Sequence, residues 1–200
     1  MRRSQDRFHG RGRMNSAIES RARTLETVYR RIHRERMADL PLANPAIGVH
    51  AIGFRPWSDG PLGVLVTPWC MNLMSLPRDP TSWANKPDLS EETLTFPSGR
   101  YRFIVGSEAG IGKYRMCSLF SSMFDFANDQ AAVETAQAVM RELLNDDHRQ
   151  QAEIDAPAIT ALWRGEPSPR ADEQSDGKRE RLLSRRELLQ GAFLKRDDTR

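Results

Sequence analysis

Cysteine and long apolar runs are both scarce in this chain. Cys70 and Cys117 are its only cysteines, and neither belongs to a Cys-x-x-Cys pair. Their scarcity excludes a disulfide scaffold and a cysteine-rich metal cage, and it fits a reducing compartment. The N-terminus lacks the apolar segment of a secretory signal, and no stretch approaches the roughly 20 apolar residues that cross a bilayer. We therefore expect a cytoplasmic protein without stable membrane insertion.

Patterns of catalytic residues are also missing. The sequence holds no Ser-His-Asp order with elbow glycines, no His-Glu-x-x-His and no Cys-His-Asn arrangement that spacing supports. Gly106, Gly110 and Gly112 could suggest a phosphate-binding loop. However, no Lys-Ser/Thr pair follows them, and we expect a strand rather than a helix next. We predict a hairpin connection there, with no catalytic residue and no cofactor.

Cys70 has soft neighbours, because Met71 and Met74 follow it closely. Thiolate and thioether groups can bind soft metal ions. One cysteine and two methionines supply too few strong ligands, so we favour burial in the core and predict no metal site.

Charge is distributed unevenly along the chain. Residues 1–36 hold 11 arginines against 4 acids, residues 37–163 carry a net charge of −6, and residues 164–200 carry +2. The middle is therefore an acidic domain between basic ends. A nucleic-acid-binding protein more often carries its positive charge on the folded body, so we expect no nucleic acid partner.

The most apolar stretch of the chain covers residues 62–77, Leu-Gly-Val-Leu-Val-Thr-Pro-Trp-Cys-Met-Asn-Leu-Met-Ser-Leu-Pro. Its first part is β-branched and predicts a buried strand, which Pro68 ends because proline has no amide hydrogen for a ladder. The stretch is either the central strand pair of the core or an apolar surface for a partner.

Periodicity predicts an α+β fold with a mostly antiparallel sheet and two main helices. Apolar residues recur at helical spacing over residues 17–40 and 128–144. Strand patterns between turn residues occur four times, at 47–54, 62–67 with a continuation past Trp69, 101–105 and 113–120. The segment 89–95 fits either a short strand or a helical turn.

The two ends of the chain differ in composition from the middle. Residues 1–14 are rich in Arg, Gly and Ser and predict a disordered basic tail, which precedes a domain over 15–164. Residues 165–177 predict a linker. In residues 178–200, apolar residues lie among arginines and lysines, which predicts a short basic amphipathic helix.

Several sequence blocks resemble the HybE-type family of [NiFe]-hydrogenase assembly chaperones. These blocks are Val-Thr-Pro-Trp at 66–69 with the apolar run to Pro77, Phe-Pro-Ser-Gly-Arg-Tyr-Arg-Phe-Ile-Val-Gly at 96–106, and Tyr-Arg-Met-Cys-Ser-Leu-Phe-Ser at 114–121. Asn44-Pro45 and the strand after it also fit. The resemblance covers about residues 20–165.

This resemblance implies a cytoplasmic, non-enzymatic chaperone for a membrane-bound uptake hydrogenase. It implies binding of the large subunit, the small-subunit precursor or both, and a role in delaying twin-arginine export until the cofactors are in place. Some relatives carry a rubredoxin, whose paired Cys-x-x-Cys this chain lacks. Ser184-Arg185-Arg186-Glu187-Leu188-Leu189 is similar to the export motif itself, but no apolar segment follows it. It either mimics that signal for a groove or forms an ordinary solvated helix.

Three functions from different classes remain open on the sequence: an assembly chaperone, a basic-tailed RNA-binding accessory protein and a small transferase using the loop at 106–112. For the chaperone, whose oligomeric state is left open, we expect client chains to bind flexible apolar side chains and the basic tail. The predicted partner-binding residues are Trp69, Met71, Met74, Met123, Phe124, Arg185, Arg186, Leu188 and Leu189.

Overall fold

A computed structural model describes residues 3–145 and 153–154 of the chain. Two compact units divide them: the first holds residues 3–90 and 104–140, and the second holds 91–103, 141–145 and 153–154. The helices are α1 (Arg3–Ile32), its π-helical continuation η1 (His33–Met37) and α2 (Asp129–Leu143). The strands are β1 (His50–Trp57), β2 (Gly60–Val66), β3 (Met71–Ser75), β4 (Glu91–Phe96), β5 (Gly99–Glu108), β6 (Gly112–Phe120) and β7 (Glu153–Ile154).

The first unit is built on an antiparallel sheet in the order β1, β2, β3, β6 and the C-terminal half of β5. In the second unit, β4 neighbours β5, and the short β7 pairs with β5 in parallel. The prediction of an α+β fold with a mostly antiparallel sheet and two main helices is therefore confirmed. The open segment at 89–95 contains a strand, β4.

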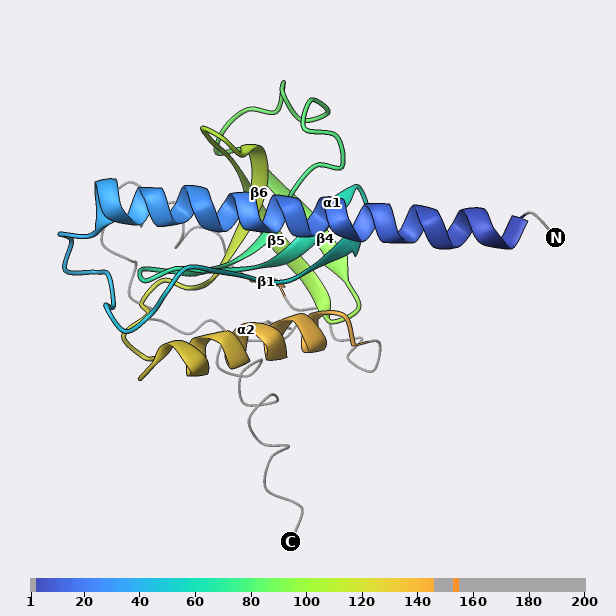
Figure 1. Cartoon of the computed structure of the whole chain (residues 1–200). Helices are drawn as coiled ribbons and strands as arrows, with labels where there is room; N and C mark the ends of the chain where they lie inside the picture. The colour runs from blue at the N-terminus through green and yellow to red at the C-terminus, as the bar shows by residue number, and fades with distance from the viewer. Residues whose placement is uncertain (1–2, 146–152, 155–200) are drawn as a thin grey trace, which may run out of the picture. The chain divides into compact units, whose positions relative to one another are not determined.

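The apolar stretch 62–77 forms the central pair of strands. Every residue of β2 and of β3 is buried. Figure 1 shows the reason: α1 lies on one side of the first unit's strands and α2 lies on the other. Side chains along a strand point alternately to the two faces of the sheet. Because both faces are covered, all of these side chains lose contact with water. Of the two interpretations of this stretch, a central strand pair or an apolar surface for a partner, the first is therefore correct for β2 and β3.

Packing under α1 is continuous across the sheet. Leu25, Val28, Tyr29 and Ile32 of α1 pack with residues of several strands in one buried cluster, whose remaining members are Val49, Leu65, Met74, Leu76, Tyr114 and Met116. Their three- and four-residue spacing along α1 is the pattern from which the helix was predicted.

Packing under α2 depends on small side chains. Ala132 and Ala136 are completely buried. At Gly53 the backbone has a φ of +66°, and an added Cβ would meet Met140 of α2 at 3.1 Å. The register of β1 against β2 shifts between Ile52 and Arg55. A glycine at this bulge therefore lets the edge strand bend without a collision with α2.

The start of the first helix was predicted wrongly. The helix begins at Arg3 rather than near Ala17. Its N-terminal turns extend past the strands of the first unit (Figure 1). Because a helix that leaves the sheet needs no apolar face, the periodic pattern marks only its packed part. The predicted domain limits stay predictions, and residues 165–177 and 178–200 lie outside the described residues.

Candidate protein-binding surface

Three loops of the first unit meet at one end of its sheet. They are residues 38–47 after η1, residues 67–70 between β2 and β3, and residues 121–128 between β6 and α2. The backbone N–H of Asn44 donates to the carbonyl of Pro68 at 2.8 Å. Its side-chain Nδ2 donates to the carbonyls of Met123 at 2.9 Å and Phe126 at 3.1 Å. We call this arrangement the loop end.

The loop end carries most of the exposed large apolar side chains. Among the described residues, five such side chains are exposed, and three of them, Leu40, Leu42 and Phe124, lie in these loops. Their exposed fractions are 41%, 46% and 55%. Single exposed apolar residues are common on proteins, but several on adjoining loops indicate a contact surface for another molecule.

Trp69 lies at the same end and is half-buried. Its ring stacks on Tyr29 with centroids 6.4 Å apart and lies 5.8 Å from the ring of His33. Pro68 ends β2, and the N–H of Thr67 closes the turn onto the carbonyl of Cys70 at 2.9 Å. The indole is therefore held in one place by α1, η1 and the turn, and a rigid aromatic residue of this kind suits a binding surface.

Cys70 follows Trp69 and is held by hydrogen bonds. Asn72 Nδ2 donates to its Sγ at 3.3 Å, and Thr67 Oγ1 lies 3.4 Å from the same sulfur. Burial raises the pKa of the Cys70 thiol to about 11, although the contacts with Thr67 and Asn72 oppose the rise. Within the described ranges no three His, Cys, Asp or Glu side chains gather so as to hold a metal ion.

Part of the predicted partner surface is core. Met71, Met74 and Met123 have no exposed area, so they cannot offer a surface to a partner in this state. Met71 and Met74 belong to β3, which is covered on both faces, and Met123 is enclosed beneath its loop. Flexible methionines thus fill the interior here, which is their other common use.

The remaining predicted residues divide into two groups. Trp69 and Phe124 lie at the loop end, where their role as contact residues stays a prediction. Arg185, Arg186, Leu188 and Leu189 lie outside the described residues. Leu40 and Leu42 were missed, although Leu40-Pro41-Leu42 places two large apolar side chains around a proline that cannot continue a helix.

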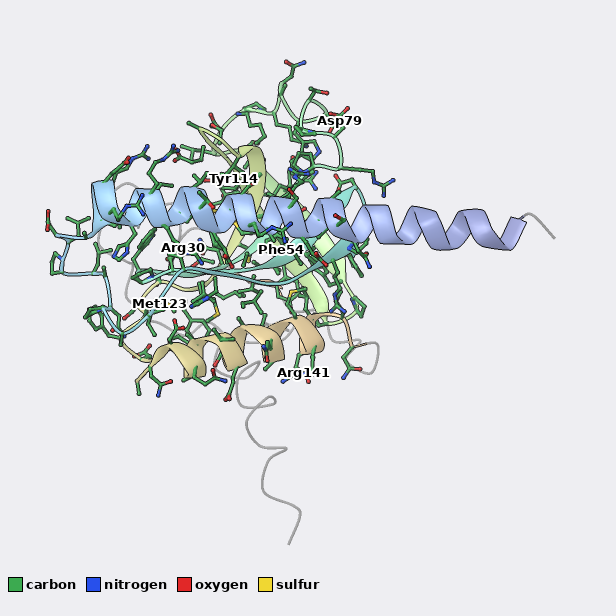
Figure 2. All side chains as sticks on the ribbon, in the orientation of Figure 1. Arg30, Phe54, Asp79, Tyr114, Met123 and Arg141 are labelled. Atoms are coloured by element: carbon green, nitrogen blue, oxygen red, sulfur yellow. The ribbon has the colours of Figure 1, made fainter. Side chains whose placement is uncertain are left out.

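Three arginines of α1 and η1 bind the protein's own backbone and carboxylates. Arg30 pairs with Glu26 at 2.9 Å and donates to the carbonyl of Val49. Arg36 pairs with Glu108 at 3.2 Å, and Arg31 donates to the carbonyl of Ala109. Figure 2 shows Arg30 and Phe54 between α1 and β1. These side chains are therefore used within the fold, which weakens the case for an RNA-binding face.

His50 serves as a structural residue. Its Nε2 lies 2.8 Å from Asp129 at the start of α2, and the N–H of Gly48 donates to the same carboxylate at 2.6 Å. Partial burial opposes ionisation of Asp129, but the Gly48 N–H and the His50 ring lower its pKa below the ordinary value. The group ties the segment before β1 to α2.

The glycines at 106–112 form a hairpin, as predicted. Gly106 pairs with Tyr114 and Glu108 pairs with Gly112 in the ladder between β5 and β6. A strand, not a helix, follows the turn, so no helix N-terminus points at the loop. In the part of the chain that the structure describes, no helix has the length and apolarity to span a membrane.

The structure first defines a class: an α+β protein that exposes large apolar side chains on the loops at one end of its sheet. The family described as [NiFe]-hydrogenase assembly, chaperone, HybE matches residues 20–191 of the chain. The chain belongs to this HybE family of hydrogenase assembly chaperones. Because the family consists of chaperones, the prediction that the protein is not an enzyme is confirmed.

Individual relatives agree with the family. The chain is 40% identical over 141 residues to a probable rubredoxin HupJ of Rhodobacter capsulatus, covering 70% of this chain and 50% of that protein. It is 39% identical over 137 residues to the hydrogenase expression/formation protein HupJ of Bradyrhizobium diazoefficiens, covering 68% and 79%. The chain thus spans about half the length of the first relative and more of the second.

A solved structure has the same fold. The solution structure of HybE from Escherichia coli superposes with a TM-score of 0.53 at 20% identity, covering 82% of this chain and 89% of that one. At this identity the likeness concerns the fold alone. The role in hydrogenase assembly comes from the family match and from the relatives named as hydrogenase expression/formation proteins.

Proposed function

We propose that this chain binds immature subunits of a [NiFe]-hydrogenase through its loop end. The observation that carries the proposal is that exposed Leu40, Leu42 and Phe124, and half-buried Trp69, lie on three loops that Asn44 joins by hydrogen bonds. An immature subunit that lacks its cofactor exposes apolar segments that are later buried. A fixed apolar surface shields such segments from solvent and releases them when the subunit folds.

The client is the large subunit, the small-subunit precursor or both, and the hydrogenase is of the membrane-bound uptake type. The chaperone acts in the cytoplasm and delays twin-arginine export of the small subunit until its cofactors are in place. The resemblance of the sequence blocks at 66–77, 96–106 and 114–121 to the family supports this part of the proposal.

The tail contributes to the export step. Arg185-Arg186 followed by Leu188-Leu189 is similar to the twin-arginine motif. We assign the tail the role of competing with the export signal for its groove during assembly. Deleting residues 178–200 is expected to let precursor reach the export machinery early, which subcellular fractionation detects as mislocalised, inactive small subunit. Unchanged hydrogenase maturation after the deletion would remove the tail from the mechanism.

Affinity purification of the tagged full-length chain from its native host tests the function. The expected result by mass spectrometry is recovery of the large subunit, or of the small subunit with its export signal uncleaved. Recovery of ribosomes or RNA without hydrogenase subunits, lost on raising the salt concentration, would overturn the proposal in favour of RNA binding.

A further inference from the structure

Asn44 lies in the first loop of the loop end and donates hydrogen bonds to each of the other two loops. It is 7% exposed and offers no surface to a partner. Its backbone N–H reaches the loop at 67–70, and its Nδ2 reaches two carbonyls of the loop at 121–128. Its Oδ1 accepts the N–H of Ala46 at 3.0 Å, and its carbonyl accepts the N–H of Ile47 at 3.1 Å.

The orientation of the Asn44 amide follows from its neighbours. Two carbonyl oxygens face Nδ2 and one N–H faces Oδ1, so only one assignment of the amide satisfies all three bonds. Pro45 follows directly and favours an extended backbone at Asn44. No other side chain of this size offers two donors and an acceptor in the same plane, so the position is chemically specific.

We infer that Asn44 is the positioning residue of the client-binding surface. Leu40 and Leu42 lie within four residues of Asn44, Phe124 follows Met123, and Trp69 follows Pro68. Trp69 and Phe124 thus each adjoin a residue whose carbonyl accepts a hydrogen bond from Asn44, and Leu40 and Leu42 lie in the same loop as Asn44. This inference rests on the proposed function, since it concerns how the same surface is held in a shape that a subunit can bind.

The Asn44→Asp substitution tests the inference with almost no change in size. A carboxylate cannot donate, and it would face the carbonyls of Met123 and Phe126. Its burial beside two carbonyl oxygens raises the pKa of the new carboxyl. When protonated it regains one donor. We expect purified variant to bind the hydrogenase subunit recovered with the wild type at least tenfold more weakly at pH 8, with partial recovery relative to the wild type at pH 5.5.

Two further variants separate positioning from stability. Asn44→Ala removes all side-chain bonds, so its binding is expected to be at least tenfold weaker at both pH values. Val139→Ala in α2, buried to 4% exposure and outside the three loops, is expected to lower the melting temperature without weakening binding. Should Asn44→Asp not fold at pH 8, Asn44→Ser, which keeps one donor and one acceptor, is expected to bind between the alanine variant and the wild type.

The outcomes are distinct. Suppose that the folded Asn44 variants bind like the wild type but replacement of Leu42 and Phe124 abolishes binding. This result would overturn the positioning role of Asn44 and would still support the loop end as the binding surface. Wild-type binding by the Leu42 and Phe124 variants would overturn the proposed function itself. Equal weakening by Val139→Ala would also overturn the inference, because it would assign the effect to global stability.

Discussion

The thiol of Cys70 lies in surroundings that disfavour ionisation, with a pKa raised to about 11 by burial. At pH 8 a group with this pKa is about two orders of magnitude less ionised than an ordinary cysteine. Because the thiolate is the reactive form, we expect alkylation by iodoacetamide to be about 100-fold slower than for a free cysteine. Timed mass spectrometry of the modified peptide measures the rate.

A Cys70→Ser variant provides the control for this rate, since it leaves Cys117 as the only thiol, and Cys117 is completely buried. Reaction of Cys70 in the folded protein at the rate of a free cysteine would contradict the described surroundings. The apolar neighbours of Cys70 predicted burial in the core, whereas the residue is only partly buried. Its contacts with Thr67 and Asn72 could not be predicted, because they depend on the turn that Pro68 starts.

Asp129 is expected to stabilise the fold near neutral pH. Its pKa is lowered in the folded state, so its contribution is present above the unfolded value of about 4 and is lost as the pH falls through the lower folded pKa. Asp129→Ala should cost roughly 1 kcal/mol at pH 7, because the N–H of Gly48 loses its acceptor. Urea unfolding at pH 7 and pH 3 measures this cost.

The difference between Asp129→Ala and the wild type should shrink at pH 3. Asp125→Ala, at an exposed position four residues earlier, is the matched control and should change stability little at either pH. A cost for Asp129→Ala that is equal at both pH values would show that ionisation of this carboxyl does not contribute.

At the scale of the elements, side chains of α1 bond to the backbone at the start of the outer edge of β1. Among the described strands, β1 has a neighbour on one side only. The N–H of Ala51 donates to Glu26 at 2.9 Å, and the carbonyl of Val49 accepts from Arg30 at 3.1 Å. A free sheet edge invites pairing with another chain, so an ion pair that occupies these groups prevents it.

Opening this edge should promote self-association. The double variant Glu26→Ala with Arg30→Ala frees the N–H of Ala51 in β1 and the carbonyl of Val49 just before it. We expect larger species than for the wild type at equal concentration by size-exclusion chromatography with light scattering. Arg31→Ala is the control, because Arg31 bonds to the carbonyl of Ala109 in the β5–β6 hairpin. An unchanged size distribution of the folded double variant would contradict the role of the pair.

Sequence patterns were sufficient to predict the helices and strands that have strong apolar periodicity and clear turn residues. The spacing of Leu25, Val28 and Ile32 predicted the packed part of α1, and Gly106 to Gly112 predicted the hairpin. The helix start was not predicted, because its first turns have no apolar face to mark them. The segment that contains β4 was left open between a strand and a helical turn, because it alternates over only a few residues. A periodic apolar pattern marks the face of an element that packs on the core. It therefore gives little information about a part of an element that extends past the sheet.

At the scale of the whole molecule, composition could not separate core from binding surface. Met71, Met74, Trp69 and Phe124 are similarly apolar in sequence, yet the first two are buried and Phe124 is exposed. What decides is the position of α1 and α2 on the two sides of the sheet, which follows from contacts distant in sequence. The loop end arises in the same way, because Asn44 joins segments almost 80 residues apart.

The central claim is that the loop end binds a hydrogenase subunit. The most direct measurement is the affinity of purified Leu42→Ser/Phe124→Ser for the subunit that co-purifies with the wild type. Leu89→Asn is the matched control: Leu89 is 61% exposed in another loop, and its φ of +64° suits asparagine. We predict at least tenfold weaker binding for the double variant and unchanged binding for the control, with both variants folded. Equal affinity of the double variant and the wild type would contradict the account.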